Sequence, residues 1–230
     1  MSRKKLIAIG CSYTRDNNKF PVWPTYLAEK LDMECINLGL PRVGNEYISA
    51  KLIDSIFLNR KEDIGLVVLM WSGWPRIDFQ DIKGEWVGLM LTHNDDKYFD
   101  FWGADNNVYH MTMRALRYFL IAQRLLEDIP YLMIQGVHNG FHGYTNAAKN
   151  RQLAVQTFIN SKIFYEIDED KFIGWPIMQE IGGRNVDDIL NKIDPERKHL
   201  RISEEDQHPN AEGHKIIAQE LYNAYEKVYM

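Results

Sequence analysis

Residues 6–14, LIAIGCSYT, decide the fold class of this chain. The first four are a continuous apolar run, which is typical of a strand buried on both faces of a parallel sheet, and Gly10 opens the loop that follows. Loops at the carboxyl ends of parallel strands are where α/β proteins meet their ligands. Ser12 in this loop is therefore a candidate functional residue, although a serine after a strand is more often a plain helix cap.

Helical and strand-like patterns alternate along the rest of the chain. Pro24 stands near the start of the first helical stretch, where its missing N–H costs nothing. The alternation predicts a three-layer α/β/α sandwich, in which helices cover a central parallel sheet. The further expected strands are residues 33–39, 66–70 and 131–135, and the expected helices are residues 23–31, 45–58, 111–126, 146–160 and 211–229.

The composition favours one compact domain over residues 1–230. A chain of this length with 45% hydrophobic residues can bury a full core. Its 32 acidic and 27 basic residues are spread along the sequence and give a formal charge of -5. We therefore expect no concentrated positive surface and no nucleic-acid partner.

The cysteines and the N-terminus indicate an intracellular protein. Cys11 and Cys35 are too few for a disulfide framework in a chain this long, which favours a reducing compartment. The apolar stretch after the basic N-terminus is too short for a signal peptide or a membrane span. We expect a cytoplasmic location and no membrane association.

The alternation stops in an aromatic and acidic insertion at about residues 75–109. This segment is too long for an ordinary connection, and we interpret it as a functional cap or a partner surface. Its aromatic side chains could stack on sugar rings, but packing within the insertion is the favoured interpretation. These aromatic residues are Trp86, Tyr98, Phe99, Phe101 and Trp102.

The second candidate site lies in residues 204–214, EEDQHPNAEGH, directly before the last expected helix. A serine nucleophile needs a base, and a neutral imidazole such as that of His208 can take the hydroxyl proton. A carboxylate on the far ring nitrogen would fix the tautomer, and Asp206 or Glu205 could supply it. Taken alone, His208 is more often a surface loop residue.

Four stretches together resemble the conserved blocks of the SGNH (GDSL-like) hydrolases, in the same order. GCSYT resembles the first block, with Ser12 as nucleophile and Cys11 in place of the usual aspartate. Residues 23–45 resemble the following helix, strand and second block, and residues 67–76 the third. The resemblance implies a flavodoxin-like sandwich, His208 as the base, and no metal or cofactor.

The resemblance also implies an oxyanion hole, but one expected donor is missing. The backbone N–H groups of Ser12 and Gly44 would bind the oxyanion. Trp74 stands where the family carries an asparagine whose amide is a further donor, and a tryptophan cannot replace it in the same geometry. Asn45 is the candidate substitute, with a helix cap as the favoured alternative for that residue.

The last block of the family usually reads Asp-x-x-His, and here the acid is ambiguous. Glu205 keeps the standard spacing to His208, whereas Asp206 lies one residue closer. We favour Asp206, because DQHPN resembles a shortened version of this block. His214 is interpreted as structural. His138 and His142 are four residues apart, but Asn139 and Gly140 between them favour a loop over a metal site.

The implied substrate is a small or carbohydrate-borne ester, with an O-acetyl group as one candidate. Two alternatives stay open. The altered third block and the shifted acid are compatible with a non-catalytic binding or structural module, for example in a phage particle, since GCSYT resembles viral members; a viral protein would work in the host cytoplasm or the virion. An acyltransferase would use the same serine, and water exclusion by the insertion would favour it.

Overall fold

A computed structural model describes residues 3–90, 107–137 and 147–230, and its centre is a parallel five-stranded sheet. The strand order is β2-β1-β3-β6-β7, which is the flavodoxin-like order once the strands outside this sheet are set aside. The predicted fold class is therefore confirmed. The strands are β1 (Lys5–Gly10), β2 (Glu34–Gly39), β3 (Ile64–Trp71), β6 (Tyr131–Gln135) and β7 (Phe172–Ile173).

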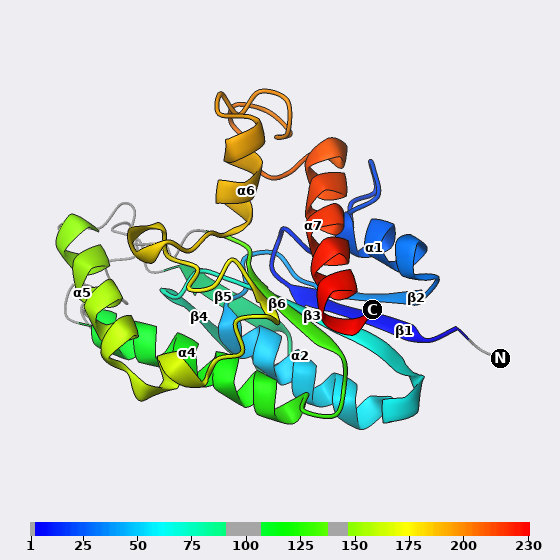
Figure 1. Cartoon of the computed structure of the whole chain (residues 1–230), viewed down its shortest axis with the longest axis horizontal. Helices are drawn as coiled ribbons and strands as arrows, with labels where there is room; N and C mark the ends of the chain where they lie inside the picture. Colours follow the sequence, from blue (N-terminus) through cyan, green and yellow to red (C-terminus); the bar gives the residue numbers. More distant parts are fainter. Residues whose placement is uncertain (1–2, 91–106, 138–146) are drawn as a thin grey trace.

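Helices cover both faces of the sheet, as Figure 1 shows. On one side α1 packs along α7, and on the other α2 and α4 lie side by side, with α5 against α4. The helices are α1 (Trp23–Leu31), α2 (Asn45–Leu58), α4 (Val108–Leu125), α5 (Ala147–Asn160), α6 (Val186–Ile193) and α7 (Ala211–Tyr229). Short 3-10 helices span Lys61–Asp63, Lys162–Glu166 and Gln179–Ile181.

The apolar strand sequences explain where the core lies. All eight residues of β3, IGLVVLMW, are buried, because this strand has neighbours on both edges and helices on both faces. Trp71 at its end packs against Phe119 of α4, with the ring centroids 5.0 Å apart. One cluster of buried apolar residues runs through the sheet and both helix layers. The interpretation of residues 1–230 as one domain stays a prediction.

The first part of the insertion is regular, which the sequence analysis did not foresee. Residues 76–80 and 86–90 form an antiparallel hairpin, β4 (Arg76–Gln80) and β5 (Trp86–Met90). Arg114 of α4 holds this hairpin by donating to the carbonyl oxygens of Trp74 and Arg76, and it pairs with Glu46 of α2 at 2.9 Å. The hairpin therefore braces the start of α2.

Packing accounts for Trp86, which is the one among the five aromatic residues named above that the structure describes. Its ring lies edge-on against Tyr47 of α2, with the centroids 5.5 Å apart. This contact favours the packing interpretation over stacking on a sugar. Tyr98, Phe99, Phe101 and Trp102 lie outside the described residues, so the proposed cap there stays a prediction.

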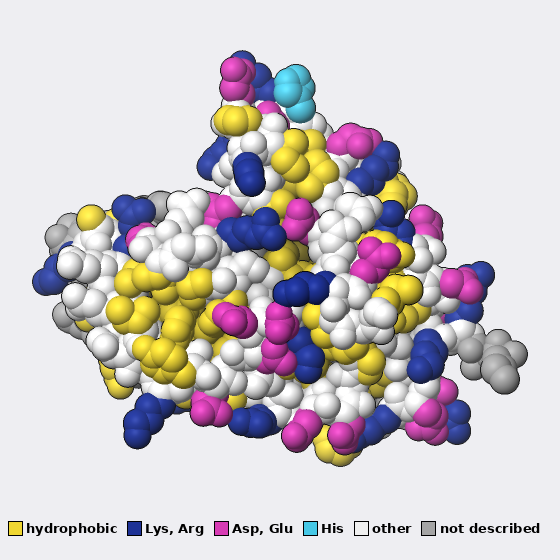
Figure 2. Space-filling view, in the orientation of Figure 1, with side chains coloured by type: hydrophobic (Ala, Val, Ile, Leu, Met, Phe, Trp, Pro, Cys, Tyr) yellow, Lys and Arg dark blue, Asp and Glu magenta, His cyan; other side chains and the backbone are white. Residues whose placement is uncertain are grey.

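Charged side chains of both signs are mixed on the face that Figure 2 draws, and both thiols are unpaired. The thiols are those of Cys11 and Cys35. Within residues 3–90, 107–137 and 147–230, no helix has the length and apolar character needed to cross a bilayer.

Candidate active site

Ser12 lies in the loop after β1, the strand between β2 and β3 in the sheet. Thr14 N donates to Cys11 O at 2.9 Å and makes a single tight turn around the serine. A Cβ on Gly10 would lie 2.2 Å from Thr14 Oγ1, so this turn requires glycine. No helix begins directly behind Ser12, because α1 starts only at Trp23; the turn itself orients the serine backbone.

Backbone hydrogen bonds within the loop fix the conformation of the segment that carries His208. Arg201 and Pro209 form a short antiparallel bridge, and Ile202 N donates to His208 O at 2.9 Å. The side chain of Asn210, which caps α7, also donates to Arg201 O at 3.1 Å. The start of α7 and this bridge thereby fix where the imidazole emerges.

The two loops meet in a continuous chain of hydrogen bonds. Nε2 of His208 lies 2.9 Å from Ser12 Oγ, and Nδ1 of the same ring lies 2.6 Å from Asp206 Oδ1. The hydrogen bond from His208 lowers the pKa of Asp206 below its usual range, so this carboxyl is ionised at neutral pH. A carboxylate at Nδ1 favours the tautomer that leaves Nε2 free to accept the serine proton.

Glu205 does not take part in this chain. Its carboxylate accepts from Ser203 Oγ at 2.9 Å, and that hydrogen bond lowers the pKa of Glu205. The side chain is exposed, and its adjacent residue Asp206 occupies Nδ1 of His208. Of the two acids that the sequence left open, the structure brings only Asp206 to the imidazole.

The backbone N–H of Gly44, the expected oxyanion donor, has a hydrogen-bond partner within the protein. This N–H donates to Asp78 Oδ1 at 2.6 Å, and Tyr47 N donates to Oδ2 of the same carboxylate at 3.0 Å. Asp78 thus caps α2 from the hairpin, and burial raises its pKa to about 6. A Cβ on Gly44 would lie 2.8 Å from Arg76 Cβ, so close packing accounts for the glycine. The N–H expected to face an oxyanion is already bonded to a carboxylate.

Asn45 is not the helix cap that the sequence favoured. Gly44 is the N-cap of α2, and Asn45 Oδ1 instead accepts from Ser72 N at the end of β3, at 2.9 Å. Within the described part of the chain, Asn45 Nδ2 has no hydrogen-bond partner. Trp74 is 1% exposed and stacks on Phe158, so the residue at the missing asparagine position belongs to the core.

A pocket of about 320 Å³ opens beside Ser12. Eight of its twelve lining residues have polar side chains, mainly from the segment after the serine and the His208 loop, and Val22, Pro41, Ile202 and Pro209 add apolar surface between them. The side chains of Asp206 and His208 are 48% and 44% exposed, so water reaches the imidazole. The lining residues are Ser12, Arg15, Asp16, Asn17, Asn18, Val22, Pro41, Ile202, Asp206, His208, Pro209 and His214.

Comparison with solved structures identifies the fold, whereas no family model and no curated protein matches the sequence. A lipolytic protein of the GDSL family from Veillonella parvula is 12% identical, with 98% of both chains covered and a TM-score of 0.50. A variant of Axe2, an acetyl-xylooligosaccharide esterase from Geobacillus stearothermophilus, is 14% identical over 97% of this chain and 94% of that chain, with a TM-score of 0.54. The chain has the SGNH hydrolase fold. These structures come from bacteria, so the resemblance to viral members finds no support in them.

His214 has a structural contact in this SGNH fold, in line with its interpretation from sequence. Its Nδ1 accepts from Trp23 N at 3.3 Å, which satisfies a backbone donor at the start of α1. The imidazole is 4% exposed, and burial lowers its pKa to about 4. A neutral His214 thus ties α1 to α7.

We expect His214 to make the SGNH fold sensitive to acid. Its stabilising effect is complete above the ordinary histidine pKa and is lost as pH falls toward about 4, because the unfolded chain binds the proton first. As pH falls from the ordinary histidine pKa to about 4, the free energy of unfolding of the wild-type protein should fall by about 3 kcal/mol more than that of His214→Gln. Denaturant titrations at several pH values measure this difference. His199→Gln, at an exposed histidine, is the control, and parallel curves for His214→Gln and wild type would contradict the assignment.

No metal site accompanies the SGNH fold in the part of the chain that the structure describes, where no group of three His, Cys, Asp or Glu side chains could hold an ion. His138 and His142 lie outside the described residues. The sequence analysis also missed three residues near His208, of which Asp187 contacts both Tyr13 and Arg201. Their positions are 13, 187 and 201, so no local spacing could have grouped them.

Proposed function

We propose that this chain is an ester hydrolase that uses Ser12 as its nucleophile. The observation that carries the proposal is the 2.9 Å contact between Ser12 Oγ and His208 Nε2, with Asp206 on the other ring nitrogen. Such a contact is within the reach that proton transfer requires. The likeness of the fold to that of an acetyl-xylooligosaccharide esterase supports the same reaction class.

The reaction proceeds through an acyl-enzyme. Ser12 Oγ attacks the ester carbonyl carbon while His208 Nε2 takes the hydroxyl proton, and Asp206 stabilises the imidazolium. The tetrahedral intermediate collapses with cleavage of the bond to the alcohol oxygen, which His208 protonates as it leaves. A water molecule then attacks the acyl carbon, His208 accepts its proton, and the acid departs with Ser12 restored.

Two donors are proposed for the oxyanion. Ser12 N has no hydrogen-bond partner in the described ranges, and it belongs to the attacking residue itself. Asn45 Nδ2 is the second, since Ser72 N anchors the other end of the same amide. Gly44 contributes by placing Asn45 rather than through its own N–H, which stays with Asp78.

The pocket supports a substrate with a short acyl group and a polar alcohol, such as a carbohydrate. Arg15, Asp16, Asn17 and Asn18 line it, and their charged and amide groups suit hydroxyl partners. A long acyl chain gains affinity only by burying its methylene groups against apolar surface. The apolar part of the lining comes from Val22, Pro41, Ile202 and Pro209. It can contact a short acyl group but is too small to bury a long chain.

Water access favours hydrolysis over acyl transfer. An acyltransferase must keep water from its acyl-enzyme, whereas about half of the His208 and Asp206 side-chain surface is exposed. A non-catalytic module is the remaining alternative, because the third block lacks its asparagine. The charge pattern still predicts no nucleic-acid partner.

The test is turnover of short esters by the purified protein. We expect hydrolysis of p-nitrophenyl acetate, with kcat/KM about tenfold or more above that for the octanoate, because a pocket of about 320 Å³ cannot enclose the longer chain in the position that attack by Ser12 requires. A fluorophosphonate probe should label one residue, which peptide mass spectrometry should map to Ser12. A folded protein that neither turns over acetate esters nor reacts with the probe would favour the binding module. Acceleration by sugar acceptors would favour transfer.

A further inference from the structure

A second connection joins the two site loops behind the imidazole. Tyr13 follows the proposed nucleophile directly, and its ring lies edge-on to the His208 ring, with the centroids 5.3 Å apart. The Tyr13 hydroxyl donates to Asp187 Oδ1 at 2.9 Å, and the side chain is 7% exposed. The residue next to Ser12 therefore contacts the imidazole and also anchors on a third element, α6.

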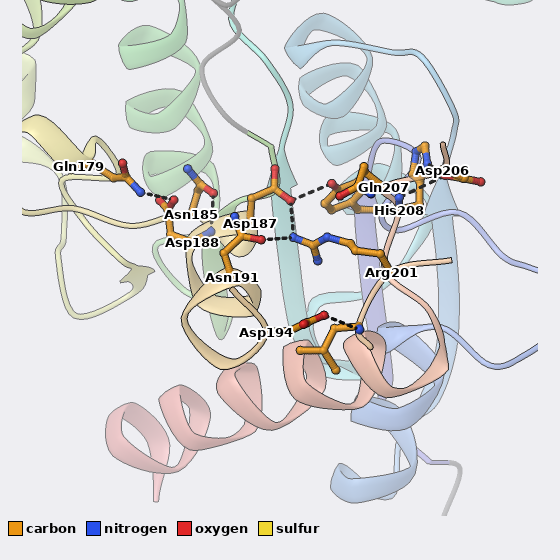
Figure 3. Close-up of polar contacts among 12 residues, drawn as sticks. Gln179, Asn185, Asp187, Asp188, Asn191, Asp194, Arg201, Asp206, Gln207 and His208 are labelled. Carbon is orange, nitrogen blue, oxygen red and sulfur yellow. Dashed lines mark hydrogen bonds and ion pairs between the residues drawn. The ribbon is translucent and has the colours of Figure 1, made fainter. Parts of the chain in front are cut away.

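Asp187 is the point where this connection branches, as Figure 3 shows. It lies in the first turn of α6, and its Oδ1 also accepts from Arg201 Nη2 at 3.1 Å. Arg201 donates further to Asn191 Oδ1 at 2.9 Å, and its side chain is 2% exposed. Because Arg201 bridges to Pro209, this guanidinium lies at the base of the His208 loop.

The position of α6 is itself fixed by local contacts. Asn185 caps the helix, and its side chain and that of Asp188 bond each other's backbone N–H groups at 3.1 and 3.0 Å. Gln179 donates to Asp188 from the preceding 3-10 turn. Asp187 is thus held on a rigid helix start, which suits it to set the spacing of two loops.

We propose that Tyr13, Asp187 and Arg201 form a positioning network that holds His208 at proton-transfer distance from Ser12. The inference rests on the proposed function. The Ser12–His208 contact is partly exposed to water and joins two loops, so water can compete for it. The Asp187–Arg201 pair is largely buried and charge-assisted, and neither residue lines the pocket, so it can hold both loops without touching the substrate.

Tyr13→Phe tests the network, because it removes only the hydroxyl and keeps the ring against His208. We expect kcat for p-nitrophenyl acetate to fall about tenfold, with KM within about twofold, since small displacements of a base slow the chemical step without altering binding. The rate of Ser12 labelling by the fluorophosphonate should fall by the same factor. Asp187→Asn added to Tyr13→Phe should cost little more than the larger single effect, because both act on one network.

The matched control is Tyr229→Phe, which also removes a tyrosine hydroxyl; this one bonds the backbone groups of Tyr131 at the far end of β6. It should lower the Tm comparably and leave kcat unchanged. A Tyr13→Phe variant with wild-type kcat and labelling rate would overturn the network and leave the proposed function standing. NMR of the His208 ring provides a readout without turnover: its signals should broaden in Tyr13→Phe only, and unchanged signals would overturn the network even in an inactive protein.

Discussion

Ser12→Ala should lower kcat for p-nitrophenyl acetate by about 10⁴- to 10⁶-fold, which is the cost of removing the nucleophile from a serine hydrolase. The variant keeps the backbone turn between Cys11 and Thr14, because no bond in that turn uses the Ser12 hydroxyl. Ground-state binding should therefore persist while the acyl-enzyme cannot form. Stopped assays at high protein concentration measure the remaining rate, and labelling by a fluorophosphonate should disappear.

Two controls make this result specific. Ser55→Ala removes another serine hydroxyl, one that bonds Lys51 O within α2, and should leave activity unchanged. An exposed imidazole can itself attack activated esters, so Ser12→Ala combined with His208→Ala shows how much of the remaining rate comes from that side chain. If folded Ser12→Ala kept more than about a tenth of wild-type activity, the serine could not be the nucleophile.

Local sequence signals predicted much of the fold. The bounds of α1, α2, β6 and α7 agree with the expected ranges, because the helices have an apolar periodicity, β6 is a short apolar run, and all four have definite ends. The alternation of helix and strand predicted a parallel sheet covered by helices, whereas the flavodoxin-like strand order was implied only by the resemblance to the SGNH hydrolases. The residues of each of these elements are sufficient to predict it, since burial in the core sets the pattern of apolar residues within the element.

The short elements were not predicted from the sequence, because their stability comes from contacts with residues far away in the chain. The two-residue strand β7 pairs only with β6, and its sequence has no alternation to detect. The hairpin β4–β5 depends on Arg114, which lies beyond the undescribed segment. A signal for α6 was present, because Asn185 and Asp188 have the spacing of a capping box, yet the weak pattern around them concealed it.

Site residues could be predicted only where the chemistry of the reaction limited the number of candidate residues. The serine after the first strand and the histidine before the last helix each support the assignment of the other, since a serine nucleophile requires a base. The partner of Gly44 could not be found in the same way. Asp78 is 34 residues away in a segment expected to be irregular, and only the hairpin brings it to the start of α2.

The second large effect on kcat is expected from replacing the acid that contacts His208, which is Asp206 and not Glu205. Asp206→Asn should lower kcat about 10²- to 10⁴-fold, because an amide at Nδ1 no longer favours the tautomer with Nε2 free or stabilises the imidazolium. Glu205→Gln should change kcat by less than about twofold, since its carboxylate bonds Ser203 and not the imidazole. Kinetics with p-nitrophenyl acetate, at matched folded concentrations, measure both.

The pair is informative because both substitutions remove one negative charge from adjacent positions of the same loop. If Asp206 acted only through the long-range electrostatic attraction between its charge and the imidazolium, Asp206→Asn and Glu205→Gln would lower kcat by similar factors. A large difference requires the direct contact of 2.6 Å between Nδ1 and Asp206 Oδ1. The opposite result, a large loss in Glu205→Gln alone, would require the ring to turn toward Glu205, and that rotation would break the 2.9 Å contact between Nε2 and Ser12 on which the proposed chemistry depends.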